Sequence, residues 1–255
     1  MRVTNLNGAL IPIGPGLLVV VAVLAVAAVL VNRWSGPGLA TTTAVACLRA
    51  VVQLAALAAI LALVIGRLWA SALFVVVMAS VAAWTSAGRV TGRRARPVAF
   101  LRCLLPVAAP TLVLVVVLVL IGILPANGLV IIPTAGIMFG GAMNTTSLAG
   151  KRAHDELRTR KGEVEAALSL GFLPRDARLE ICRPAAITAL IPGLDQTRSV
   201  GLVTIPGAFV GMVLGGASTT AAAAMQLFVL IALLAVSAVA AVITVEMVAR
   251  SRFGL

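Results

Sequence analysis

The sequence predicts an all-α, polytopic membrane protein with about seven transmembrane helices and one large polar loop on the cytoplasmic side. Of the 255 residues, 61% are hydrophobic and only 11% are charged, and the mean hydropathy is +1.13. One soluble core could not hide that much apolar surface, which excludes an ordinary cytosolic globular domain. A membrane span needs about 20 consecutive apolar residues, and several uncharged stretches reach that length. The basic residues concentrate in alternate gaps between these stretches, as they do on the cytoplasmic side of membrane proteins.

The positions of the basic residues set the predicted topology. Sixteen of the 20 Lys and Arg residues fall in the gaps 32–40, 89–102, 151–183 and 249–255, which we assign to the cytoplasm. The seven predicted spans are 10–31, 41–65, 68–87, 104–124, 129–149, 185–203 and 221–247. An odd number of spans that begins outside ends inside. We therefore expect a multi-pass plasma-membrane protein with an uncleaved first span, an outer N-terminus and a cytoplasmic C-terminus.

Two long apolar stretches need internal breaks, because a helix rises only 1.5 Å per residue. The turn cluster Pro125-Ala126-Asn127-Gly128 divides the first stretch. In the second, Ile205-Pro206-Gly207 and Gly215-Gly216 interrupt the helix. The segment 204–220 is therefore expected to be either an outer loop or a re-entrant segment, which is tolerated only inside protein or a water-filled cavity.

The one substantial polar region is 151–183, which holds eight basic residues and six of the eight acidic residues. We expect it to form one or two short cytoplasmic helices. The whole chain, 1–255, is then a single transmembrane domain from which this loop projects.

Composition excludes several functions. A net charge of +12 suggests nucleic acid in a soluble chain, but aromatic residues are only 4% and there is no Tyr. Membrane topology explains the charge, so no nucleic-acid partner is expected. His154 is the single histidine, and the three cysteines are widely spaced, so neither a catalytic triad nor a metal quartet can form. Gly150-Lys151 lacks the rest of a Walker sequence. We expect no enzyme activity and no cofactor on this chain.

Ionisable and polar residues inside the predicted spans are candidates for a translocation pathway, because they cost about 2.5–3.5 kcal/mol each on translocon scales. Asp195 and Arg198 stand three apart on one helix face, close enough to neutralise each other. Arg49 and Gln53 stand four apart, and Asn144 begins the polar run 144–147 near the end of the fifth span. A buried ion pair that holds the bundle together is an equally good interpretation. The methionines fit packing better than metal binding, so no metal ligand is assigned.

A spaced motif occurs in the polar loop. Glu165-Ala166-Ala167, Gly171, Ile181 and Pro184 follow the pattern E-A-A-x3-G-x9-I-x-L-P, with Arg183 in place of Leu. The run from Glu163 to Leu170 contains good helix formers, and Gly171 can adopt the left-handed conformation that ends a helix. The motif resembles the coupling-helix loop of ABC-transporter permeases, in which a short helix docks on a partner ATPase. The resemblance implies ATPase-coupling roles for Glu163, Glu165, Ala166, Ala167 and Gly171. An ordinary amphipathic loop remains the alternative.

The resemblance extends over residues 45–250. The matching segments include Arg49-Ala50-Val51-Val52-Gln53-Leu54, Ile132-Pro133-Thr134-Ala135-Gly136, Ile191-Pro192-Gly193-Leu194-Asp195 and Val200-Gly201-Leu202-Val203-Thr204-Ile205-Pro206-Gly207. They are similar to the FetB-type family of ABC permeases, which is associated with metal export, chiefly of iron. Plant relatives are linked to aluminium tolerance and nucleotide-sugar transport. The chain departs from the family at Gly141, where an Asn is expected, and at Arg183.

The resemblance implies the membrane subunit of an ATP-driven exporter for iron or another metal ion. It would work as a permease homodimer in the lipid bilayer with a separate ABC-type ATPase, which would carry ATP and Mg. Two alternatives remain: a self-contained ion-coupled carrier that uses Asp195 as its titrating carboxylate, and an ABC permease for a nucleotide-sugar or other organic solute. ATP dependence separates the carrier from the ABC permeases.

Overall fold

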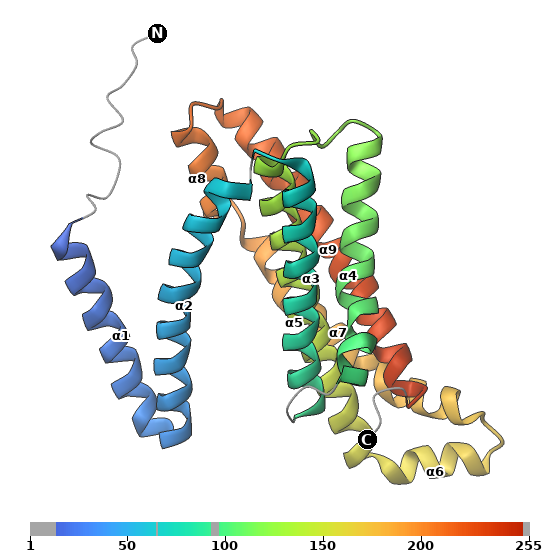
Figure 1. The fold of residues 1–255 in the computed structure, drawn as a ribbon. Coiled ribbons are helices and arrows are strands. Elements are labelled where there is room, and N and C mark those ends of the chain that lie inside the picture. The colour runs from blue at the N-terminus through green and yellow to red at the C-terminus, as the bar shows by residue number, and fades with distance from the viewer. Residues whose placement is uncertain (1–13, 65, 93–96, 252–255) are drawn as a thin grey trace. The chain divides into compact units, whose positions relative to one another are not determined.

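The structure is a computed structural model that describes residues 14–64, 66–92 and 97–251. Within those residues the chain forms nine helices and no β-strand (Figure 1). The helices are α1 (Pro15–Ser35), α2 (Pro37–Val64), α3 (Leu68–Thr91), α4 (Pro97–Leu120), α5 (Gly128–Thr159), α6 (Lys161–Ser169), α7 (Pro174–Ser199), α8 (Gly207–Leu214) and α9 (Thr219–Ala249). The all-α class predicted from the sequence is therefore confirmed for the described residues.

The chain divides into two compact units, residues 1–66 and 67–255. The first unit contains the helix pair α1 and α2. Gly36, with a φ of +155° that favours glycine, is the only residue between them. Asn32 Nδ2 donates a hydrogen bond to Thr43 Oγ1 at 2.8 Å and ties the two helices together near this turn.

The second unit is a bundle in which α5 and α9 are central. Helix α5 packs against α3, α4, α7 and α9, and α9 packs against α4, α7 and α8 as well. The buried side chains along these two helices are mostly small, with Ala, Ser and Thr at many of the contacts. In contrast, many Val and Leu side chains of α3 and α4 are exposed. An apolar exterior around a small-residue core is the arrangement that a bilayer favours.

Glycines let α3 and α5 approach closely at two levels. A Cβ added at Gly136 would lie 2.8 Å from Met78 Cε, and one added at Gly150 would lie 2.7 Å from Val90 Cγ2. Between these levels, Ser86 Oγ donates to the Met143 carbonyl oxygen at 3.1 Å. Close packing of small residues therefore joins the two helices, as expected where no hydrophobic effect drives helices together.

Six of the described helices are long and apolar enough to cross a membrane: α1, residues 38–61 of α2, α3, α4, α5 and α9. They correspond to six of the seven predicted spans. The exception is the predicted span 185–203, which falls in α7. That helix ends in the polar run Asp195-Gln196-Thr197-Arg198-Ser199, and this polar end lowers its hydropathy below that of the other long helices.

The segment 204–220 contains α8, which packs against α9. Eight residues of helix rise about 12 Å, much less than the ~30 Å hydrocarbon core. Helix α8 therefore cannot cross the bilayer, in agreement with the helix breaks predicted on either side of it.

Candidate functional site

Helix α6 lies at the end of the second unit where α5 and α9 finish and α7 begins (Figure 1). The predicted polar loop 151–183 is mostly helical. Helix α5 continues ten residues beyond the predicted span end at 149, and α7 starts at Pro174. Helix α6 covers the predicted helical run 163–170 except for its last residue. Gly171 then adopts a φ of +89°, the left-handed conformation expected there.

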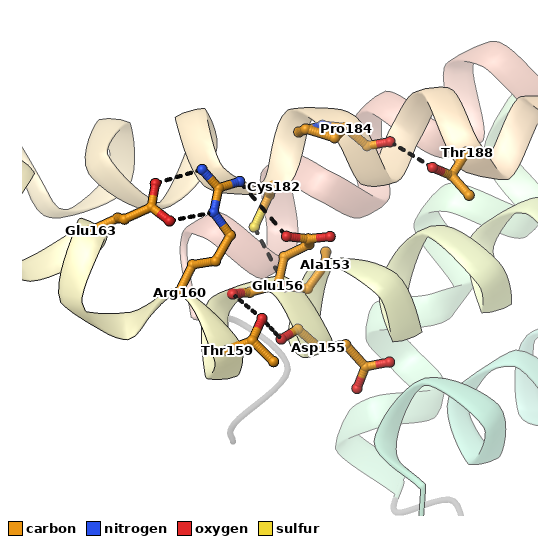
Figure 2. A network of polar contacts seen from close by, with 9 residues as sticks. All are labelled: Ala153, Asp155, Glu156, Thr159, Arg160, Glu163, Cys182, Pro184 and Thr188. Carbon is orange, nitrogen blue, oxygen red and sulfur yellow. Dashed lines mark hydrogen bonds and ion pairs between the residues drawn. The ribbon is translucent and has the colours of Figure 1, made fainter.

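Arg160 holds α6 against the end of α5 (Figure 2). Its Nε and Nη2 donate to the two carboxylate oxygens of Glu163 at 2.7 and 2.6 Å. Its Nη1 lies 3.7 Å from Glu156 Oε2. The hydrogen bonds from Arg160 lower the pKa of the Glu163 carboxyl, and the same pairing raises the pKa of Arg160. Glu163, a predicted coupling residue, therefore has a structural partner within the chain.

The remaining predicted coupling residues lie on the outer side of α6 or at its end. Glu165 is exposed, and its Oε1 lies 3.6 Å from Lys161 Nζ in an ion pair. Ala166 is exposed and Ala167 is partly buried. A Cβ added at Gly171 would meet open space. These residues are accessible on the surface of the chain.

An apolar cluster at the end of α6 is a feature that the sequence analysis missed. Leu170 is 80% exposed and Leu173 is 68% exposed, with Leu168 and Phe172 exposed beside them. We call these four residues the α6 apolar tip. In the sequence, the apolar run Leu168-Ser169-Leu170-Gly171-Phe172-Leu173 inside a polar loop could have indicated this cluster. Only the structure shows that none of the four large side chains is buried. Exposed apolar clusters with polar surroundings are typical of interaction sites.

A second missed feature joins the start of α7 to the end of α9. Arg175 Nε and Nη2 donate to the two carboxylate oxygens of Glu246, both at 2.7 Å, and Arg250 Nε donates to Glu246 Oε1 at 2.5 Å. Arg178 also donates to Ser251. We call the Arg175, Glu246 and Arg250 contacts the α7–α9 clamp. Arg175 and Glu246 are 71 residues apart, so no local pattern indicates this pairing.

Cys182 connects α7 to α5 (Figure 2). Its Sγ lies 3.8 Å from the Ala153 carbonyl oxygen, and the side chain is fully buried. Burial raises the pKa of the Cys182 thiol to about 11. The thiol is therefore an uncharged group that packs between α7 and α5.

The structure pairs Asp195 with Arg198 but does not bury them within the chain. Arg198 Nη1 lies 3.6 Å from Asp195 Oδ1, and the two side chains are 75% and 62% exposed. The interpretation of an ion pair buried inside the bundle of one chain is therefore wrong. The reason is that these residues lie on a face of α7 that the described residues of the second unit leave largely uncovered.

The other predicted pathway residues fall in two places. Arg49 and Gln53 lie on α2 in the first unit, and both side chains are exposed. Asn144 lies on α5 in the second unit, where its Oδ1 accepts a hydrogen bond from Arg89 Nη1 at 3.1 Å. Among the residues that the structure describes, no group of three or more His, Cys, Asp or Glu side chains could hold a metal ion.

The fold and these sites define a multi-pass α-helical membrane protein. The chain belongs to an uncharacterised protein family, UPF0014, whose profile matches residues 16–253. It is 30% identical to UPF0014 membrane protein slr1647 of Synechocystis over 80% of both chains. It is also 37% identical to Protein ALUMINUM SENSITIVE 3 of Arabidopsis thaliana, over 56% of this chain and 54% of that protein.

A third relative carries a functional name. The chain is 28% identical to the Probable iron export permease protein FetB of Escherichia coli over 51% of each chain. The match therefore spans about half the length of FetB, as it does for the Arabidopsis protein. These relatives confirm the resemblance to the FetB-type family. No solved structure matches the chain.

Proposed function

We propose that this chain is the membrane-spanning permease subunit of an ATP-driven ABC exporter, with α6 as the helix that docks on a separate ATPase. The observation that carries this proposal is the α6 apolar tip. Four large apolar side chains are exposed at the end of a helix that is itself held by ion pairs at its start. In water this surface is unfavourable to leave uncovered, and a partner protein with an apolar groove would cover it.

The proposed topology has seven spans, with α7 residues 185–199 as part of the sixth. The N-terminus lies outside, and α6 lies in the cytoplasm where an ATPase can reach it. The concentration of basic residues around the α6 end supports this orientation. In this arrangement the exposed Asp195 and Arg198 face a second copy of the chain or a pathway between the copies.

The ATPase would bind ATP and Mg and would close when ATP is bound. Closure would move α6, and the Arg160 contacts would transmit the movement to the end of α5. The α7–α9 clamp would make α7 and α9 move together. A nucleotide-driven change of this kind requires that the two permease states differ in their affinity for the ATPase conformations.

The proposed cargo is iron or another metal ion, because the FetB relative is named as an iron export permease. Away from the inner ends of the spans, where Glu246 lies, one chain offers a single carboxylate, Asp195, together with hydroxyl and amide oxygens. A weak site shared by two copies of Asp195 across a homodimer would suit an exporter, which must release its load. Oxygen ligands also suit hard or borderline cations.

The proposed docking function is tested by co-purification with a candidate ABC-type ATPase that is expressed together with this chain. Leu170→Ala and Phe172→Ala together should abolish co-purification and ATP-dependent transport in reconstituted vesicles. Replacing Glu165 and Gly171 should weaken coupling between hydrolysis and transport. Leu202→Ala is the matched control, because Leu202 is also a highly exposed apolar side chain, at 90%, but lies outside the apolar tip. Retained ATPase binding after loss of Leu170 and Phe172 would reject the docking role.

A further inference from the structure

An open surface pocket of about 700 Å³ lies between the end of α3 and the middle of α5. Its lining includes two basic side chains, Arg89 from α3 and Lys151 from α5, and two neutral polar ones, Asn144 and Ser147. A second pocket of about 570 Å³ shares Arg89 and Lys151 and continues along the same two helices to Arg158. Basic residues that are distant in the sequence therefore lie close together along the contact between α3 and α5.

The polar groups of this pocket are held in place by contacts within the chain. Arg89 donates one hydrogen bond to Asn144 Oδ1 at 3.1 Å, which uses one of the five N–H donors of a guanidinium. Ser147 Oγ donates to the Met143 carbonyl oxygen at 2.6 Å. The close approach of Val90 to Gly150 fixes the spacing of the helices beside them. The pocket is therefore built on two rigid, tightly packed helices.

The two cations of this pocket have no ion-pair partner among the residues that the structure describes. Of the ion pairs formed by the described residues, none involves Arg89 or Lys151. Asp155 lines the second pocket but not the first. Two cations with spare donors, beside the amide of Asn144, match the oxygens of a phosphate group. A bare metal cation would be repelled at the same place.

We propose that Arg89, Asn144 and Lys151 form a binding site for a phosphate-bearing anion. The phosphate could belong to the headgroup of an anionic lipid, because α3 is long enough to span the membrane and the pocket lies at its end. Basic pockets between membrane helices bind such headgroups. It could equally belong to a soluble phosphate compound. The site does not depend on coupling to an ATPase.

The test is a binding titration of the purified full chain in a neutral detergent, without any ATPase. The first probe is sodium pyrophosphate, with sodium chloride of equal ionic strength as the reference. The second is short-chain phosphatidylglycerol, with short-chain phosphatidylcholine as the reference. Saturable binding of either anionic probe supports the site. Pyrophosphate binding identifies a soluble ligand, and binding of phosphatidylglycerol alone identifies a lipid headgroup.

Variants separate the pocket from general surface charge. Arg89→Gln and Lys151→Gln should each weaken binding about tenfold, which corresponds to the loss of one charge-assisted hydrogen bond. Arg152→Gln removes the same charge one residue along the helix, outside both pockets, and should leave affinity within about twofold. Lys151 is exposed, so its variant will fold even where loss of Arg89 disturbs the Asn144 contact.

Arg89→Lys is a conservative substitution for the same titration. It keeps the positive charge, so it should retain part of the affinity that Arg89→Gln loses. Two results would overturn the proposal. One is equal weakening by Arg152→Gln and Lys151→Gln, which would indicate diffuse surface charge. The other is the absence of saturable binding for both anionic probes.

Discussion

The ion pair between Asp195 and Arg198 faces outward from its own chain, and its energetic value depends on what surrounds it. A pair this exposed in water contributes about 0–1 kcal/mol. Where the same pair lies against lipid or an apolar partner, removing one member leaves an unpaired charge out of water, which lowers the free energy of unfolding by more. In the proposed topology the second situation applies, since these residues stand in a membrane span.

A double-mutant cycle measures which environment surrounds the pair. We expect Asp195→Asn and Arg198→Gln each to lower the unfolding free energy of the assembled permease, and the double variant to lower it by less than their sum. The coupling energy should exceed about 1 kcal/mol, the upper range for exposed pairs. Thermal unfolding in lipid nanodiscs provides the measurement. Additive effects would place the pair in water instead.

Gly141 stands where the family resemblance leads us to expect an Asn, and a neighbouring side chain limits what fits there. A Cβ added there would lie 2.2 Å from Leu233 Cδ1 and 3.4 Å from Ser237 Oγ. Leu233 of α9 therefore occupies the space that a side chain at position 141 would need. An Asn at this position requires Leu233 to move, so the two positions are expected to change together.

At the scale of elements, α6 depends on a stop signal at its end as well as on its ion pairs. Gly171 N–H donates to the Leu168 carbonyl oxygen at 3.0 Å, and Phe172 N–H donates to the Ala167 carbonyl oxygen at 3.1 Å. This pattern closes the helix and turns the chain so that Phe172 and Leu173 remain outside. The left-handed φ of Gly171 makes the turn possible.

Gly171→Ala should loosen the end of α6, because a left-handed conformation costs a residue with a Cβ roughly 1–2 kcal/mol. Amide hydrogen exchange of residues 166–172 should accelerate by about 5- to 30-fold. Gly162→Ala is the matched control. Gly162 lies within α6 with open space around it and no left-handed φ, so exchange there should be unchanged or slower. Equal effects of the two substitutions would contradict the stop-signal role.

The α7–α9 clamp belongs to the same scale, because it fastens the first turn of one helix to the last turn of another. Glu246→Gln should weaken the contacts of both Arg175 and Arg250. The groups are partly exposed, at 44%, 27% and 48% for Arg175, Glu246 and Arg250, so we expect a cost of only about 1 kcal/mol. Hydrogen exchange of residues 174–181 should rise, and transport per ATP hydrolysed should fall.

Glu180→Gln is the control for the clamp. Glu180 also lies on α7, but its ion pair with Arg183 at 3.1 Å is within one helix and exposed. Its loss removes the same charge without separating two helices. If Glu180→Gln and Glu246→Gln reduce coupling equally, charge on α7 matters and the clamp does not.

At the scale of the whole molecule, α5 connects two ends of the second unit. The polar helix α6 follows one end of α5, and the turn between α4 and α5 precedes the other. Residues 125–127 precede α5, and Asn127 Oδ1 caps it by accepting from Leu129 N–H at 3.0 Å. Thirty-two residues of α5 separate this turn from Arg160. At 1.5 Å per residue the helix is about 48 Å long, enough to reach from one side of a bilayer to the other.

Cysteine labelling of intact cells tests the proposed orientation. In a variant with Cys47, Cys103 and Cys182 replaced by Ala, a cysteine at Ala126 should react with a membrane-impermeant maleimide. One at Lys161 should react only after the membrane is permeabilised. Both positions are exposed, and neither substitution removes the Asn127 cap. Labelling of position 161 but not 126 on intact cells would reverse the topology.

The sequence by itself determined the membrane class, the positions of most long helices and the short helix ended by Gly171. These follow from hydropathy, helix breakers and local conformational preference, which act over neighbouring residues. Only the tertiary structure decided that Glu246 pairs with Arg175, that Arg89 and Lys151 share a pocket, and that Asp195 lies outside the core of its chain. These relationships join residues up to 71 positions apart. They depend on how helices pack, and helices with apolar residues on every side carry no periodic signal of which face is buried.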